Sequence, residues 1–125
     1  MPPQRLEELG PLINALEAER DADGRWRRWV NERLATDYAA LFARLQRLIF
    51  LAALGFACVS GWRLQQERTN AIDEGGTTMD RAQLEAFAAY YERITRHPMA
   101  CLPSRADAVV RLGPSREVRS LEIRR

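Results

Sequence analysis

The chain has 125 residues, of which 46% are hydrophobic and 29% are charged, and its formal net charge is +2. This length suits one domain, and the composition is typical of a folded globular protein rather than a disordered one. The small net charge gives no reason to expect nucleic acid as a partner. All 19 basic residues are arginines. The chain therefore cannot hold a G-x-x-x-x-G-K-[ST] phosphate-binding loop, whose lysine reaches the phosphates.

The first part of the sequence predicts a loop over 1–10 and helices over 11–46. Pro11 suits the first position of a short helix that runs through Glu19. The turn residues D-A-D-G end this helix, and Asp23 is then placed to cap a long helix from Arg25 to Gln46. On that long helix, apolar residues recur at three- and four-residue steps, which indicates one face packed against a core.

The next stretch, RLIFLAALGFACVSGWRLQQE, allows two interpretations. Its apolar run from Leu48 to Trp62 is fifteen residues long with arginines on both sides, whereas a membrane-spanning helix needs about 20 apolar residues. We therefore favour a buried strand over 48–52, a break at Gly55 and a helix over 56–72. The membrane segment over 48–62 is the alternative.

The last part predicts a loop over 73–78, a helix over 79–97 capped by Thr77 or Thr78, and two short strands within 108–123. Pro98 and Pro103 are expected to kink or end the helix. Three basic residues at its end, Arg93, Arg96 and His97, are expected to form a basic tip. Of the two strands, 108–112 has the pattern of a core strand and 118–123 that of an edge strand. The whole chain, 1–125, is thus predicted to be a single α/β domain with helices packed on a small, mostly parallel sheet.

Three motifs carry a resemblance to a known family. They are N-A-L-E at 14–17, W-R-x-x-Q-E at 62–67 and Y-E-R-x-T-R-H at 91–97. In this order and spacing the sequence resembles the D-glycerate 3-kinase-like family of P-loop kinases. The resemblance implies an ATP-dependent phosphotransferase that acts on a small hydroxy acid such as glycerate, with ATP and Mg²⁺ bound by the intact enzyme.

The absent phosphate-binding loop sets this chain apart from that family. We therefore predict a partial P-loop kinase fold that corresponds to the C-terminal half, with the N-terminal nucleotide-binding half absent. Such a chain is expected to be inactive alone and to bind no cofactor by itself. Its expected partners are the hydroxy acid and either a second copy of the chain or a separate N-terminal half. The expected location is the cytoplasm.

The resemblance also suggests site residues. Arg63 resembles a lid arginine that closes over the transferred phosphate and is the predicted catalytic residue, because its planar fork suits phosphate. Gln66 and Glu67, one turn further along, would position Arg63 or bind a substrate hydroxyl. Arg27, Arg28 and Asn31 would line the carboxylate side of the substrate. The alternative for both groups is a solvated polar helix face.

Cys58 and Cys101 lack the spacing of metal ligands, and no metal site is expected. A second function stays open from the sequence. This is a small non-catalytic helical interaction protein, associated with a membrane through residues 48–62.

Overall fold

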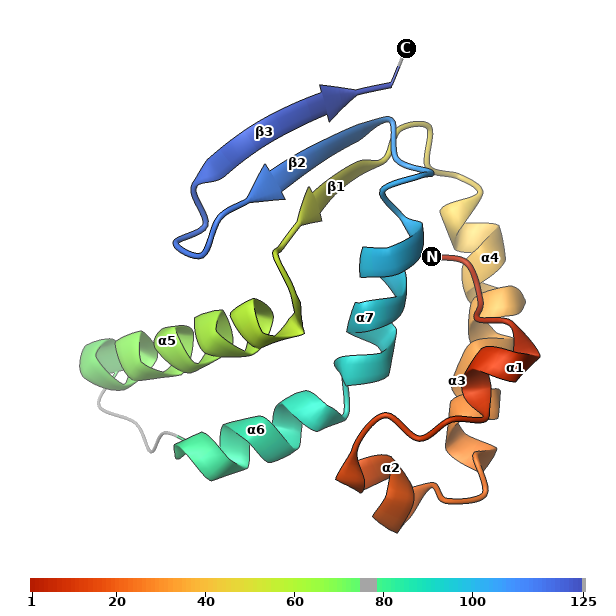
Figure 1. Ribbon diagram of the computed structural model, residues 1–125, viewed down its shortest axis with the longest axis horizontal. Helices are drawn as coiled ribbons and strands as arrows, with labels where there is room; N and C mark the ends of the chain where they lie inside the picture. The colour runs from red at the N-terminus through yellow and green to blue at the C-terminus, as the bar shows by residue number, and fades with distance from the viewer. Residues whose placement is uncertain (75–78, 125) are drawn as a thin grey trace.

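A computed structural model of the protein describes residues 1–74 and 79–124 (Figure 1). In chain order its elements are α1 Leu6–Leu9, α2 Ala15–Arg20, α3 Arg25–Ala35, α4 Asp37–Phe42, β1 Ile49–Ala52, α5 Phe56–Glu74, α6 Arg81–Ala89, α7 Glu92–Cys101, β2 Ala108–Leu112 and β3 Val118–Ile123. Figure 1 shows α7 beneath the sheet, between the α5–α6 pair and the α3–α4 pair. The predicted α/β class is confirmed.

The sheet has the order β1-β2-β3. β1 pairs with β2 in parallel and places Phe50 beside Val109. β2 pairs with β3 in antiparallel and places Val110 beside Leu121. The sheet is therefore mixed rather than mostly parallel. The cause is the short connection over 113–117, because a tight turn can join only antiparallel strands.

The starts of α2 and α3 depend on side chains that cap their free N–H groups. Asn14 accepts a hydrogen bond from the Glu17 N–H at 2.9 Å, so α2 begins after Asn14 rather than at Pro11. Asp21 accepts hydrogen bonds from the N–H groups of Trp26 at 2.7 Å and Arg27 at 3.0 Å. The predicted cap, Asp23, accepts from the Arg25 N–H at 3.1 Å, so Asp23 and Asp21 cap the start of α3 together.

Two predicted long helices are each divided in the structure. The first is interrupted at Thr36, whose hydroxyl donates to the Glu32 carbonyl at 2.8 Å. The second is interrupted at Tyr90, just before α7. There the Asn14 side chain donates to the Ala89 carbonyl at 3.0 Å and so satisfies a carbonyl that the break leaves without a helical partner. Pro98 does not end α7, which continues to Cys101.

Three further boundaries differ from the prediction. The predicted loop over 1–10 contains the short helix α1. In the predicted loop over 73–78, residues 73 and 74 belong to α5, and 75–78 lie outside the described residues. The cap of α6 is Asp80, which accepts from the Gln83 N–H at 2.8 Å. Thr77 and Thr78, the predicted caps, also lie outside the described residues.

The apolar run from Leu48 to Trp62 divides as predicted into a strand, a turn and the start of a helix, which are β1, residues 53–55 and α5. Within the described residues, no helix combines the length and the apolar character that a membrane span requires. The apolar run thus belongs to two different elements of the fold.

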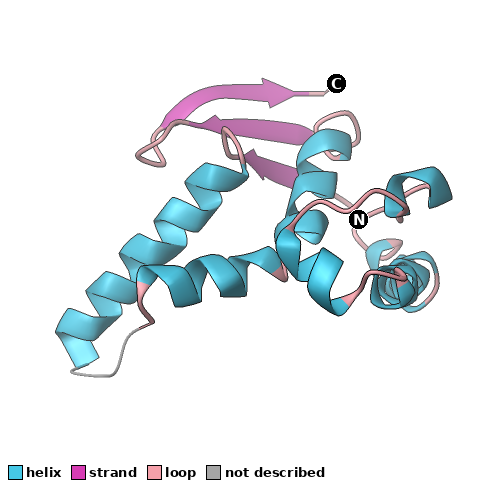
Figure 2. Ribbon diagram, turned by 60° about the horizontal axis from the view of Figure 1, so that its bottom comes forward, coloured by secondary structure: helices cyan, strands magenta, loops and turns pink. Residues whose placement is uncertain are grey.

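The core of the sheet layer is small and lies on the face that the helices cover. It consists of Ala52, Ala106 and Val109, with Leu48 and Phe50 packed against them. All the described helices lie on this one side of the sheet (Figures 1 and 2). The strand register places four large side chains together on the opposite face, and they are 58% to 68% exposed: Ile49, Leu51, Leu121 and Ile123. We call these four residues the apolar sheet face.

Candidate functional site

The predicted catalytic arginine is held by its two predicted neighbours on α5. Arg63 Nη1 donates to Gln66 Oε1 at 2.8 Å, and Arg63 Nη2 lies 2.7 Å from Glu67 Oε1. These contacts follow from the helical spacing, since residues three and four apart face each other. The Arg63 side chain remains 43% exposed, so its guanidinium is fixed in orientation and still accessible to a ligand.

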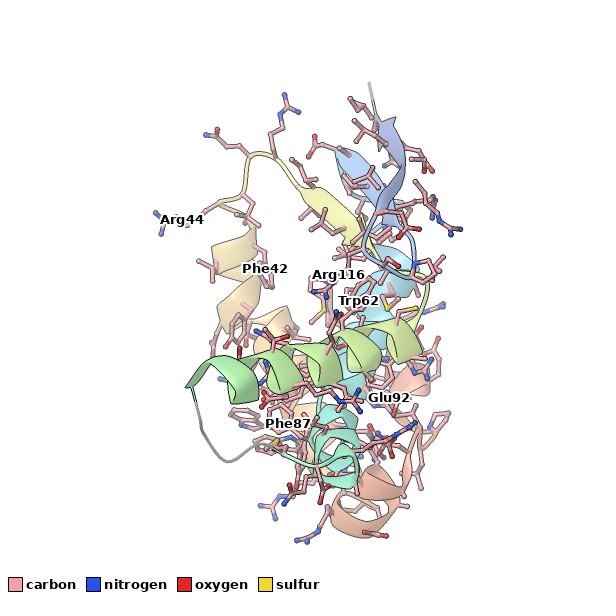
Figure 3. All side chains as sticks on the ribbon, turned by 90° about the vertical axis from the view of Figure 1, so that its left-hand side faces the viewer. Phe42, Arg44, Trp62, Phe87, Glu92 and Arg116 are labelled. Atoms are coloured by element: carbon pink, nitrogen blue, oxygen red, sulfur yellow. The ribbon has the colours of Figure 1, made fainter. Side chains whose placement is uncertain are left out.

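A neighbouring cluster attaches α5 to the turn between β2 and β3. Trp62 Nε1 donates to the Pro114 carbonyl at 2.7 Å, and the Arg116 guanidinium lies 5.8 Å from the centre of the Trp62 ring. Arg116 Nη2 also donates to Gln65 Oε1 at 2.5 Å. Figure 3 labels Trp62 and Arg116, which lie beside each other between α5 and the sheet. The sheet thereby fixes the helix that carries Arg63.

The start of α5 lies at the carboxyl end of β1, where α/β sheets commonly bind ligands. A pocket of about 380 Å³ lies there, lined by residues 52–56 and by Arg96 and Arg111. Arg96 lies over the Phe56 ring at 5.3 Å and is paired with Glu92 at 2.8 Å. Arg111 is paired with Glu122 at 2.7 Å. Each of these two guanidinium groups therefore already forms an ion pair with a carboxylate.

The second predicted group, Arg27, Arg28 and Asn31, is divided by the fold. Arg27 and Asn31 line a pocket of about 470 Å³ between α3 and the α6–α7 pair. Arg28 instead donates to the Asp23 carbonyl at 2.7 Å on the surface. The Asn31 side chain binds the backbone of Gln4 at both ends, accepting from its N–H at 2.7 Å and donating to its carbonyl at 3.0 Å. None of the α5 side chains over 56–70 lines this pocket, so the structure does not bring the two predicted groups together.

Arg27 belongs to a buried network of charged side chains that the sequence did not indicate. Glu17, Asp21, Arg27 and Arg93 are each between 7% and 9% exposed. Glu17 binds Arg93 through two contacts, to Nε at 2.6 Å and to Nη2 at 2.8 Å. Arg27 lies 3.3 Å from an Asp21 carboxylate oxygen and 3.7 Å from one of Glu17. The network joins α2, α3 and α7.

The network corrects the predicted basic tip. Arg93 lies in the first turn of α7, because the helix is interrupted just before it, and it is buried rather than at a helix end. Burial raises the pKa of Glu17, but the hydrogen bonds from Arg93 and the Ile13 N–H, together with the positive charges of Arg93 and Arg27, outweigh that effect. The pKa of Glu17 is therefore below its ordinary value. His97 bonds through Nε2 to the Pro2 carbonyl at 2.9 Å.

Comparison with known structures identifies the fold. The D-glycerate 3-kinase from Cryptococcus neoformans var. grubii serotype A superposes with a TM-score of 0.63 and 22% identity, over 93% of this chain and 46% of that one. The chain has part of the D-glycerate 3-kinase fold. The YGR205w protein superposes with a TM-score of 0.60 and 21% identity, over 93% of this chain and 45% of that one. The predicted partial P-loop kinase fold is thereby confirmed.

The chain thus spans less than half the length of either structural neighbour. No protein-family model and no curated protein matches its sequence. Because the identities are low, the comparison concerns the fold, and the roles of Arg63 and of the other predicted site residues remain predictions. Among the described residues, no group of three or more potential ligands could hold a metal ion.

Proposed function

We propose that these 125 residues are the lid-bearing part of an ATP-dependent phosphotransferase for a small hydroxy acid, inactive without a phosphate-binding loop from outside this sequence. The fold of a D-glycerate 3-kinase supports the reaction class. The observation that carries the proposal is Arg63, held by Gln66 and Glu67 on the helix that leaves the carboxyl end of β1. Kinase chemistry and two free cysteines fit a cytoplasmic location.

Arg63 would stabilise the negative charge that develops on the phosphoryl oxygens during the transfer. Each of its terminal nitrogens makes one intrahelical contact, and each carries a second N–H that can donate to a phosphoryl oxygen. Because Gln66 and Glu67 hold the guanidinium, little side-chain freedom is lost when the phosphate binds. Stabilisation by such fixed donors is the main contribution of the protein to phosphoryl transfer.

The residues of this chain do not form a binding site for a nucleoside triphosphate by themselves. The sequence contains no lysine and no G-x-x-x-x-G-K-[ST] motif. When bound, ATP would supply the phosphoryl group, but its phosphates need donors from outside these 125 residues. We therefore assign no step of ATP binding to the described residues.

The apolar sheet face supports the need for a partner, by which we mean a part of the fold that lies outside these 125 residues. Its four large apolar side chains are mostly exposed, whereas sheets of kinase-like α/β folds are normally covered on both faces. The partner would cover this face and so bring its phosphate-binding loop to the carboxyl ends of the strands. A second copy of the chain is the other candidate for the same face.

The experiment measures phosphorylation of glycerate from radiolabelled ATP. We expect no turnover by the 125-residue chain alone and turnover after mixing with a purified polypeptide that contains the unmatched part of a D-glycerate 3-kinase. Arg63→Ala should then reduce turnover by a hundredfold or more, whereas Arg68→Ala, an exposed arginine on the same helix, should not. Turnover by the chain alone would refute the need for a partner. Equal turnover by Arg63→Ala would refute the role of Arg63.

A separate measurement tests the docking face. Leu121→Lys places a charge in the apolar sheet face and should abolish activation by the second polypeptide. Leu6→Lys changes a side chain that is 78% exposed on α1, and it should leave activation unchanged. Sedimentation of each variant without the partner shows whether the same face also joins two copies, because self-association through it would be lost in Leu121→Lys and kept in Leu6→Lys.

A further inference from the structure

The turn between β2 and β3 is held in one shape by its own contacts. The Gly113 N–H donates to the Glu117 carbonyl at 2.8 Å, and the Arg116 N–H donates to the Gly113 carbonyl at 3.0 Å. The Glu117 carboxylate lies over Gly113, where an added Cβ would be 1.8 Å from Oε1. The same carboxylate accepts a hydrogen bond from the Ser115 N–H at 3.0 Å. The turn therefore has a defined backbone that can hold its groups against α5.

Arg116 has a backbone conformation that usually selects glycine. Its φ is +65°, and among the described residues it is the one residue other than glycine with a positive φ. A side chain is unfavourable in this conformation because its Cβ crowds the following carbonyl, whereas glycine has no Cβ and adopts it freely. Glycine would therefore suit the hairpin better than arginine. The reason for an arginine at this position must lie in what its side chain contacts.

The side chain of Arg116 contacts α5. Its Nη2 donates to Gln65 Oε1 at 2.5 Å, and its guanidinium lies 5.8 Å from the centre of the Trp62 ring (Figure 3). Trp62 in turn donates to the Pro114 carbonyl at 2.7 Å. Between the α5 side chains at 56–70 and the other elements that the structure describes, these are the two hydrogen bonds. Polar attachment of this part of the helix therefore depends on the turn.

The attached residues, Trp62 and Gln65, lie three positions apart on one face of α5. Arg63 follows Trp62 directly and so points about 100° away from that face. Two contacts at different heights on one face oppose rotation of the helix about its axis, and such a rotation would turn the Arg63 guanidinium away from its target. Catalytic groups must be held to within about 10–20° of the productive direction. We propose that Arg116 is a positioning residue that sets the rotation of α5 and thereby the direction of Arg63. The proposal rests on the proposed function for the reaction in which Arg63 acts.

Hydrogen exchange of the chain alone, followed by NMR without ATP or any partner, tests the attachment. In Arg116→Gly, the Trp62 indole N–H and the α5 amides at 59–70 should exchange at least fivefold faster, whereas the α3 amides should exchange as in the original chain. Arg116→Asn, which tolerates the same backbone conformation, should give the same result. Arg116→Lys should recover part of the protection, because lysine can still donate to Gln65. Unchanged exchange in Arg116→Gly, or equal acceleration in α3 and α5, would overturn the proposal.

Turnover in the mixture with the unmatched part of a D-glycerate 3-kinase tests the consequence for Arg63. Arg116→Gly should lower kcat at least tenfold and leave KM for glycerate unchanged, because Arg63 would contact the transferred phosphoryl group rather than glycerate. Arg119→Ala is the control, since Arg119 pairs with Glu117 within the hairpin at 3.3 Å, and it should leave kcat unchanged. Full kcat in a variant with accelerated α5 exchange would overturn the role of Arg116. Absence of turnover in the original mixture would instead refute the proposed function, and hydrogen exchange would then decide whether Arg116 holds α5.

Discussion

Removing the negative charge of Glu17 should strongly destabilise the protein. Glu17 accepts hydrogen bonds from Arg93 at 2.6 and 2.8 Å and from the Ile13 N–H at 3.1 Å. In Glu17→Gln, one carboxylate oxygen becomes an NH₂ group, which cannot accept the bonds that this oxygen accepted, and the negative charge is lost. Arg93 then keeps its contacts with two backbone carbonyls but loses its compensating charge in a buried position.

The size of the effect follows from what the network retains. Removing one partner of a buried ion pair costs about 3–5 kcal/mol. Arg27 still has Asp21 at 3.3 Å, so only the charge of Arg93 is left without a partner. We therefore expect a loss at the lower end, about 3 kcal/mol. This is a large part of the total stability of roughly 5–15 kcal/mol that is common for single domains.

Urea unfolding followed by circular dichroism measures this loss. Glu85→Gln is the matched control, because it breaks the exposed Arg81–Glu85 pair, and exposed pairs contribute little. Its unfolding midpoint should not move. Arg93→Gln and the double variant complete a mutant cycle, in which the double variant should lose less than the sum of the two single losses. A loss below about 1 kcal/mol in Glu17→Gln would refute the argument from burial and unpaired charge.

Three further tests concern the effect of pH on Glu17, the conformations of two glycines and the hydrogen bond of Trp62. Because the pKa of Glu17 lies below its ordinary value of 4.5, its contribution to the free energy of unfolding is complete above pH 4.5 and is lost as the pH falls through the lowered pKa. Acid should therefore destabilise the original chain more than Glu17→Gln, and parallel pH profiles would contradict this. Gly24 has φ +71°, and an added Cβ would lie 2.8 Å from Arg27 Nη2, so Gly24→Ala should cost at least about 1–2 kcal/mol. Gly61→Ala, in open space on α5, should instead stabilise by about 0.5–1 kcal/mol, and equal effects in urea unfolding would refute the difference. Trp62→Phe removes the hydrogen bond to the Pro114 carbonyl and should lower the unfolding free energy by about 1 kcal/mol; an unchanged urea midpoint would show that this bond does not hold the turn.

The elements with a strong local signal could be predicted from the sequence. The continuous apolar run of β1, the break at Gly55 and the alternation of β3 all depend on neighbouring residues, and these assignments were correct. The contact between Arg63 and Gln66 was also predictable, because it follows from a spacing of three residues in a helix. Local patterns therefore located the strands and the geometry around the predicted lid arginine.

The features that the sequence missed depend on distant residues. Glu17 and Arg93 are 76 positions apart, and nothing in either neighbourhood indicates that they meet. The same network explains why Arg27, which has the pattern of an arginine beside an apolar stripe, is buried against the Leu9 carbonyl. The break before α7 likewise depends on Asn14, which binds Ala89 from another helix. Such tertiary contacts override local helix preference.

The distribution of apolar and charged side chains links the fold to the proposed function. The helices away from the sheet are joined through a buried ionic network, whereas the apolar cluster against the sheet, among the residues that the structure describes, consists of Ala52, Ala106 and Val109 with two partly buried neighbours. Four larger apolar side chains lie in water on the opposite face. Covering them would add roughly 25 cal/mol for each square ångström of apolar surface removed from water, without disturbing the network. A polypeptide that covers this face should therefore stabilise the sheet that holds Trp62 and, through it, the helix that carries Arg63. Under the proposed function, covering this face would thus place the phosphate-binding loop and order the helix of Arg63 together.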